Sequence, residues 1–332
     1  MTTKVKTIVL TGNGTNCEME MAHACRLAGS DVVDVVHISE LLCGEKRLGD
    51  YHFLNLPGGF LDGDDLGSAK AGANRFIHAT IRGSREKLYG QLVDFIRDGK
   101  LILGVCNGFQ LMIKLGLLPA LGGDYATQTV TLTFNDSGRF EDRWVYLKTN
   151  EDSPCVFTRG LRGMYLPVRH GEGKIVTDNP DVLKRLRAGN QIVMQYSDPT
   201  YEKTAMEYPL NPNGSVDAVA GICDESGRIF GLMPHPEAYL HYTNHPRWTR
   251  ESCPRTGRVF LFSETPSILS RTFSKISLSF RLVSRTTDAV RTPFPQGIEG
   301  DRCSYIMVDR LSESYRNVAG GNILIAVRGE RG

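Results

Sequence analysis

One cysteine of this 332-residue chain stands where a nucleophile is expected. The apolar run 101–105 leads into Gly104-Val-Cys106-Asn-Gly108, and a helical pattern follows at once. G-x-C-x-G is the cysteine form of a sharp strand-to-helix turn that exposes a nucleophile. The two glycines avoid clashes in that turn, and the helix N-terminus favours the reactive thiolate. Because a lone cysteine is also a common buried side chain, Cys106 needs catalytic partners.

A general base follows late in the sequence, in Gly231-Leu-Met-Pro-His235-Pro-Glu237. The prolines on both sides of His235 exclude a helix interior and favour an extended backbone. In an extended segment residues i and i+2 point to the same side, so Glu237 is expected to reach the imidazole. The pattern predicts Cys106 as nucleophile, His235 as general base and then acid, and Glu237 as the group that orients the imidazole.

Acyl transfer at a cysteine also needs backbone N–H groups that stabilise an oxyanion. The residue after the nucleophile usually supplies one, which here is Asn107. The second donor is expected at Gly59 in Pro57-Gly-Gly59-Phe60, since glycine lets the backbone approach a ligand closely.

Two further segments allow more than one interpretation. The acidic run Asp62-Gly-Asp-Asp65 lacks calcium-loop spacing, so a turn or solvated loop is favoured over a cation site. His170, in Arg169-His-Gly-Glu-Gly-Lys174, is either a substrate contact or a loop histidine satisfied by the backbone. Histidines and cysteines do not cluster at metal-ligand spacing, so no metal site is expected.

Alternating elements must position these residues. The first half predicts strands at 7–10, 32–38, 53–56 and 101–105, and helices at 18–27, 69–81, 88–96 and 108–115. This order indicates an α/β fold with an open, mostly parallel sheet and helices on both faces. Ligands of such sheets bind beyond the carboxyl ends of the strands, where residues 57–59 and Cys106 stand. Candidate strands at 144–148, 165–169, 192–196, 216–222 and 229–233 predict a strand-rich extension of the same domain.

Bulk composition excludes several classes of protein. A hydrophobic fraction of 41% and a charged fraction of 23% are ordinary for a globular protein, and a net charge of +2 gives no case for nucleic acid. No apolar run approaches the roughly 20 residues that span a bilayer, and the N-terminus reads as a strand, not a signal peptide. A cytoplasmic protein is therefore expected. Its eight cysteines, which include no C-x-x-C pair, are expected to be free thiols.

The composition changes near residue 251. Residues 252–332 hold 11 Arg, 1 Lys and 11 Ser, whereas residues 1–251 hold 16 Arg, 11 Lys and 9 Ser. Helical and strand periodicity fades, although 273–283 and 322–327 retain strand-like patches. The predicted division is a domain at 1–251 and an atypical, Arg- and Ser-rich extension at 252–332, which a frameshift would explain.

At these motifs the chain resembles the class I, triad-type glutamine amidotransferases, and among them the glutaminases of phosphoribosylformylglycinamidine synthase. The likeness covers about residues 5–250 and rests on the segments around Cys106, Gly59, His170 and His235, together with Gly138-Arg-Phe-Glu-Asp-Arg-Trp-Val145 and Asn213-Gly-Ser-Val-Asp217. The resemblance implies that Cys106, His235 and Glu237 form the triad, that Gly59 and Asn107 stabilise the oxyanion, and that Gln110 lies near bound glutamine.

The resemblance also implies partners. The chain would hydrolyse glutamine through a thioester and pass ammonia to a large synthetase subunit, which uses ATP and Mg²⁺ on formylglycinamide ribonucleotide in purine biosynthesis. A small bridging subunit would complete the complex. No cofactor is expected in this chain, which lacks a Walker-type phosphate loop. Two other functions stay open: another cysteine hydrolase on a similar sheet, and a catalytically silent regulatory subunit.

Overall fold

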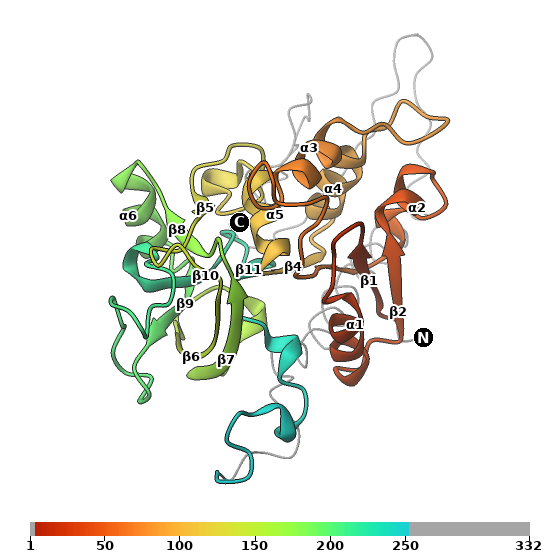
Figure 1. The fold of residues 1–332 in the computed structure, drawn as a ribbon. Helices are drawn as coiled ribbons and strands as arrows, with labels where there is room; N and C mark the ends of the chain where they lie inside the picture. Colours follow the sequence, from red (N-terminus) through yellow and green to blue (C-terminus); the bar gives the residue numbers. More distant parts are fainter. Residues whose placement is uncertain (1–3, 252–332) are drawn as a thin grey trace, which may run out of the picture. The chain divides into compact units, whose positions relative to one another are not determined.

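The structure, a computed structural model, describes residues 4–251, and nine strands of this part form one central sheet. They are β1 (Lys6–Thr11), β2 (Val32–His37), β3 (Phe53–Leu56), β4 (Leu101–Val105), β6 (Glu141–Thr149), β7 (Gly163–His170), β9 (Ile192–Ser197), β10 (Val219–Cys223) and β11 (Ile229–Leu232). Their order is β2-β1-β3-β4-β11-β10-β9-β6-β7 (Figure 1). A separate pair joins β5 (Thr131–Thr133) to β8 (Lys174–Val176).

The first five strands in this order are parallel, which confirms the predicted α/β class. All five residues of β4, Leu-Ile-Leu-Gly-Val, are buried. Strands that helices cover on both faces have this continuous apolar character.

The remaining four strands are antiparallel and continue the same sheet. The strand-rich region is therefore an extension of the first, as predicted. The longest pairing joins β6 to β7, from Glu141 opposite His170 to Lys148 opposite Gly163. The strand expected at 216–222 begins only at Val219, because Asp217 has a left-handed backbone (φ +54°) inside a short 3-10 turn.

The α-helices of the described residues are α1 (Glu18–Leu27), α2 (Ile38–Leu42), α3 (Lys70–His78), α4 (Leu88–Arg97), α5 (Asn107–Lys114) and α6 (Pro180–Ala188). Figure 1 shows α1 on one side of the parallel strands and α3, α4 and α5 on the other. Right-handed crossovers place these helices on opposite faces. Across the sheet, the step from β1 to β2 runs in the opposite direction to the step from β3 to β4. Between residues 4 and 251 no helix combines the length and apolarity needed to cross a bilayer.

Four neighbouring parallel strands end at the same edge of the sheet. The loops after β1, β3, β4 and β11 begin at Gly12, Pro57, Cys106 and Met233. The edge predicted from the sequence therefore gathers the Pro-Gly-Gly, cysteine and His-Pro-Glu segments, together with the loop after β1.

Candidate active site

Cys106 occupies a strained turn between β4 and α5. Its backbone angles are φ +52° and ψ −109°, which a non-glycine residue rarely adopts. A Cβ on Gly104 would lie 2.8 Å from the carbonyl oxygen of Gly108, and a Cβ on Gly108 would overlap the carbonyl oxygen of Leu56. Both glycines are thus required because α5 packs closely against β3 and β4.

His235 and Glu237 form a buried pair. The Nδ1 of His235 lies 2.6 Å from Oε1 of Glu237, and each residue is about 2% exposed. His235 itself is extended, but Pro236–Ala238 form a 3-10 turn. The expected contact is present, although the turn, and not an extended segment, brings the two side chains together.

Charge neighbours control the protonation of His235. Burial by itself lowers the pKa of this imidazole, but the Glu237 carboxylate and negative charge on Cys106 outweigh burial and raise the pKa well above its ordinary value. The hydrogen bond to Glu237 places a proton on Nδ1, so Nε2 is the nitrogen left to exchange protons. Within residues 4–251, neither Nε2 of His235 nor Oε2 of Glu237 has a hydrogen-bond partner.

The loop after β3 lies beside Cys106. Gly59 has φ +141°, and a Cβ there would lie 2.7 Å from the carbonyl oxygen of Gly14, so glycine is needed. The N–H of Phe60 donates to the same carbonyl, which ties this loop to the one after β1. Among the described residues, the N–H groups of Gly59 and Asn107 donate no hydrogen bond, so both are available to an oxyanion.

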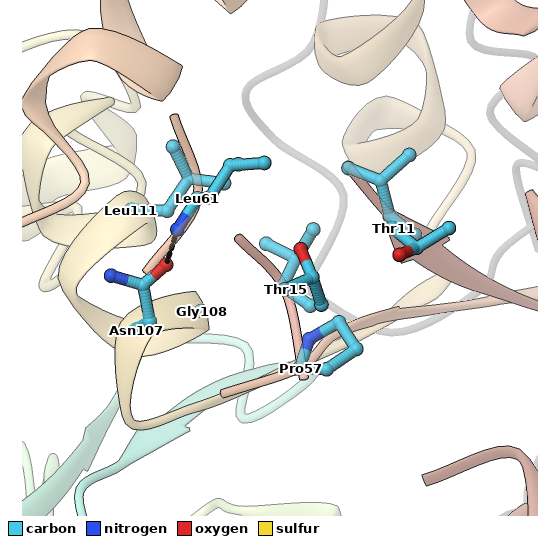
Figure 2. A pocket seen from close by; sticks show the side chains of 9 residues that line it. Thr11, Thr15, Pro57, Leu61, Asn107, Gly108 and Leu111 are labelled. Carbon is cyan, nitrogen blue, oxygen red and sulfur yellow. Dashed lines mark hydrogen bonds between the residues drawn. The ribbon is translucent and has the colours of Figure 1, made fainter. Parts of the chain in front are cut away.

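The side chain of Asn107 locks this loop to α5. Its Oδ1 accepts the N–H of Leu61 at 2.9 Å (Figure 2), and its Nδ2 donates to Oε1 of Gln110 at 3.0 Å. The Nε2 of Gln110 in turn donates to the carbonyl of Glu172 at 2.6 Å. The mostly apolar space between loop and helix in Figure 2 measures only about 10 Å³. Gln110 therefore links α5 to the segment after β7.

Two adjoining hollows meet at Cys106. One, of about 240 Å³, is lined by Cys17 and His235, and the other, of about 120 Å³, by Gln110 and Glu172. Both share Cys106, and its Sγ lies 3.6 Å from the carbonyl oxygen of Arg169 at the end of β7. The size suits a small polar substrate that reaches the sulfur from solvent.

His170 is fully buried at the end of β7. The Nδ2 of Asn135 donates to the carbonyls of Arg139 and His170, so its Oδ1 faces the ring and accepts the Nδ1–H of His170 at 3.1 Å. Burial, together with the charge of His235, lowers the pKa of His170 to about 3. The side chain of Asn135 thus holds the ring, and the imidazole is neutral.

The acidic run after the Pro-Gly-Gly loop stabilises the chain locally. Asp62 forms a 2.8 Å ion pair with Arg75, and Asp64 accepts hydrogen bonds from Ser68 and the N–H of Ala69. Burial raises the pKa of Asp64. These contacts fit the turn, which was one of the two structures favoured from the sequence, better than the solvated loop, which was the other.

Sequence reasoning missed Cys17, whose Sγ lies 3.9 Å from Nδ1 of His235. A signal existed, because Cys17 follows a strand whose neighbour carries the Pro-Gly-Gly loop. It also missed Asn135 and Glu172, which hold the segment after β7; no spacing marks them.

Comparisons with known proteins agree with this geometry. Residues 4–265 match the CobB/CobQ-like glutamine amidotransferase domain family. The chain is 44% identical over 256 residues to the phosphoribosylformylglycinamidine synthase subunit PurQ of Methanococcus maripaludis, covering 76% of this chain and 90% of the relative. It is 45% identical over 254 residues to the PurQ subunit of Dehalococcoides mccartyi, covering 76% and 93%. The structure of PurLQS from Thermotoga maritima superposes with a TM-score of 0.57 at 28% identity, covering 80% of this chain and all of that one.

Proposed function

This chain belongs to the CobB/CobQ-like glutamine amidotransferase family and, within it, to the PurQ subunits of phosphoribosylformylglycinamidine synthase, and we propose that it hydrolyses L-glutamine to glutamate and ammonia at Cys106. One observation carries the assignment of residues. In the described part of the chain, Cys106, His235 and Gly59 line one cavity, Glu237 is hydrogen-bonded to His235, and Asn107, whose N–H is free, follows Cys106 directly. These are the parts that acyl transfer through a thioester needs.

The chemistry proceeds in two halves. The thiolate of Cys106 attacks the side-chain amide carbon of glutamine, and the N–H groups of Gly59 and Asn107 stabilise the oxyanion. His235 gives the proton on Nε2 to the departing nitrogen, which leaves as ammonia, and a glutamyl thioester remains on Cys106. His235 then takes a proton from water as the water attacks the thioester, and glutamate leaves. Glu237 keeps the imidazole oriented throughout.

Substrate binding is assigned to the second hollow. Gln110 lines it and keeps one amide N–H beyond its bond to Glu172, and His170 lies at its wall. In this proposal Gln110 contacts the amino-acid end of glutamine directly, whereas the enclosed ring of His170 supports the wall from behind.

The ammonia is destined for a synthetase subunit. That partner would bind ATP and Mg²⁺ and convert formylglycinamide ribonucleotide to formylglycinamidine ribonucleotide in purine biosynthesis, with a small bridging subunit in the same complex. The similar Thermotoga maritima structure is that of an assembly, PurLQS, which supports this proposal. Three exposed rings around the cavity mouth, Phe60, Phe134 and Phe140, give a partner apolar surface to cover. The unbridged cysteines of the described residues suit the proposed cytoplasmic location.

The test is a Cys106→Ala variant assayed with the synthetase partner. Synthesis supported by glutamine should be abolished, while synthesis supported by added ammonia should persist. Cys43→Ala, which changes an exposed thiol, is the matched control and should retain both activities. Equal loss of both activities in Cys106→Ala would refute the division of labour. Labelling by a glutamine-like electrophile, located by peptide mass spectrometry, should map to Cys106.

The same assay separates the other two functions. A cysteine hydrolase of another kind would not need free glutamine, and a silent regulatory subunit would release no glutamate from it. The intact triad geometry disfavours a silent subunit, and the similarity to PurQ subunits disfavours another cysteine hydrolase.

The proposed domain boundary stays at residue 251, with an atypical extension at 252–332 that lies outside the described residues, as do the strand-like patches at 273–283 and 322–327. The compositional change supports this division, although the family match continues to residue 265. Resequencing the gene around codon 252 tests the frameshift. An intact frame whose product resists protease beyond residue 251 would contradict it.

A further inference from the structure

Cys17 gives the active site a second sulfur that the glutaminase reaction does not use. It occupies the N-cap position of α1, and its N–H donates to the carbonyl of Gly58, so its backbone position is fixed. Its Sγ lies 3.9 Å from Nδ1 of His235. Gly58 leaves the space between them open, since a Cβ there would lie 3.3 Å from this sulfur and 2.8 Å from Cε1 of His235.

Three side chains of different chemistry meet at this point. One ligand atom from each of Cys17, His235 and Glu237 can be chosen so that all three lie within 4.8 Å of one another. Zn²⁺, bound tetrahedrally by thiolate, imidazole and carboxylate at about 2.0–2.3 Å, separates its ligand atoms by about 3.3–3.6 Å. The 3.9 Å contact between sulfur and nitrogen is close to this spacing, and the 2.6 Å contact between His235 and Glu237 needs to open by less than about 1 Å.

A second observation also points to a ligand here. The Oε2 atom of Glu237 is buried and has no hydrogen-bond partner among residues 4–251. A buried carboxylate with an unpartnered oxygen is costly, and a cation bound by this carboxylate would offset that cost. Cys17 and His235 also line the larger hollow, which gives an ion a route from solvent and leaves room for water as a fourth ligand.

We propose that Cys17, His235 and Glu237 form an inhibitory binding site for a borderline-soft divalent cation of the Zn²⁺ type. Thiolate and imidazole ligands select such ions over Mg²⁺ or Ca²⁺. The spacing of histidines and cysteines along the sequence gave no sign of this site, because its ligands come from loops after β1 and β11.

Cation binding would inactivate the triad by changing the protonation of His235. The ion takes the place of two protons, that of the Cys17 thiol and the Nδ1 proton that the His235 imidazolium shares with Glu237, and both protons are released to solvent. The ring proton that remains is on Nε2, so that nitrogen cannot accept another proton from the attacking water. Inhibition therefore rests on the proposed function, whereas cation binding does not.

The experiment measures binding and activity separately. Zn²⁺ binding to the full-length chain is followed by competition with a chromophoric chelator, and Co²⁺ serves as a spectroscopic probe of thiolate ligation. Wild type should bind one Zn²⁺ in this site and show a thiolate-to-cobalt charge-transfer band. Cys17→Ala should lose the band and at least tenfold in Zn²⁺ affinity, while Cys106→Ser and Cys43→Ala should keep both.

Activity is measured with the synthetase partner in buffers of controlled free Zn²⁺. Glutamine-dependent turnover of wild type should fall reversibly with Zn²⁺, and Cys17→Ala should need at least tenfold more. Unchanged binding in Cys17→Ala, or loss of binding in Cys106→Ser with retention in Cys17→Ala, would overturn the site. If wild type releases no glutamate at all, the proposed function fails, and the binding experiment still decides this inference.

Discussion

The parallel half of the sheet reaches the cavity through four loop ends, which carry Cys17, Gly59, Cys106 and His235. The antiparallel half contributes through β7, where Arg169 lines the same cavity and the carbonyl of Pro167 accepts the N–H of His235. The first set offers sulfur, imidazole and N–H groups that can react or stabilise charge. The second set offers backbone acceptors that hold those groups in place.

This difference follows from topology. Carboxyl ends of adjacent parallel strands share one edge, so reactive side chains gather there without further arrangement. Strand β7 is antiparallel and ninth in sheet order, and it contacts the site only because the sheet curves back toward it. The N–H of His235 donates to the carbonyl of Pro167 at 2.8 Å, so this contact fixes the backbone of His235. We therefore expect substitutions in the parallel half to reduce turnover and substitutions in the antiparallel half to act mainly on stability.

The largest effect is expected from Glu237→Gln in the parallel half. The amide cannot compensate an imidazolium, so glutamine-dependent kcat should fall by about 10⁴-fold, as when a triad carboxylate is neutralised elsewhere. Because the carboxylate raises the pKa of His235, the variant should lower that pKa and move the alkaline limb of kcat/KM to lower pH. Steady-state glutamate release across pH measures both. Glu86→Gln, which removes a surface carboxylate paired with Arg47, should change neither.

The second effect tests how closely the loop ends pack. In Gly58→Ala the new Cβ would lie 2.8 Å from Cε1 of His235, so the ring must shift, and kcat/KM should fall by about 10²-fold. Gly90→Ala is the matched control, since that glycine lies in α4 with no described atom within 4 Å of an added methyl group and should gain up to about 1 kcal/mol in stability. Full activity in Gly58→Ala would show that the loop tolerates the methyl group.

The third prediction separates positioning from stability. Asn107→Ala removes the lock between α5 and Leu61, so turnover should fall about 10–100-fold and the free energy of unfolding by about 1–2 kcal/mol. Asn150→Ala removes comparable bonds, to Asn190 and Ile192, in the antiparallel half. It should lose similar stability without the kinetic loss. Equal turnover in the two variants would contradict the idea that the parallel half controls turnover and the antiparallel half mainly stability.

The smallest effect concerns the antiparallel half alone. His170 stays neutral in the folded state down to about pH 3, whereas in the unfolded chain it binds a proton below about pH 6.5. The unfolded state therefore binds more protons in this window, and stability falls as the pH falls, by about 2 kcal/mol between pH 6.5 and pH 5. His170→Gln should remove the contribution of His170 to this loss of stability. Urea unfolding at pH 6.5 and at pH 5 measures the difference.

Much of the parallel half was predictable from residue types. Helix α1 and strands β3 and β4 begin and end at the predicted residues, because apolar runs, Gly29 and the Gly-x-Cys-x-Gly turn mark their ends locally. Helix α6 was not predicted, and β5 and β8 are only three residues long. Strands so short carry too few residues for an alternating pattern to be recognised.

The sequence by itself determined which groups can react: a cysteine on a glycine-flanked turn, a histidine between prolines and a glutamate two residues on. These depend on local backbone chemistry, which a few neighbouring residues set. Only the tertiary structure decided what surrounds them. The carbonyl of Arg169 beside Cys106, the bond from Asn107 to Leu61 and the approach of Cys17 to His235 join residues 46 to 218 positions apart. Contacts of that range follow from strand order and sheet curvature, which no local pattern encodes.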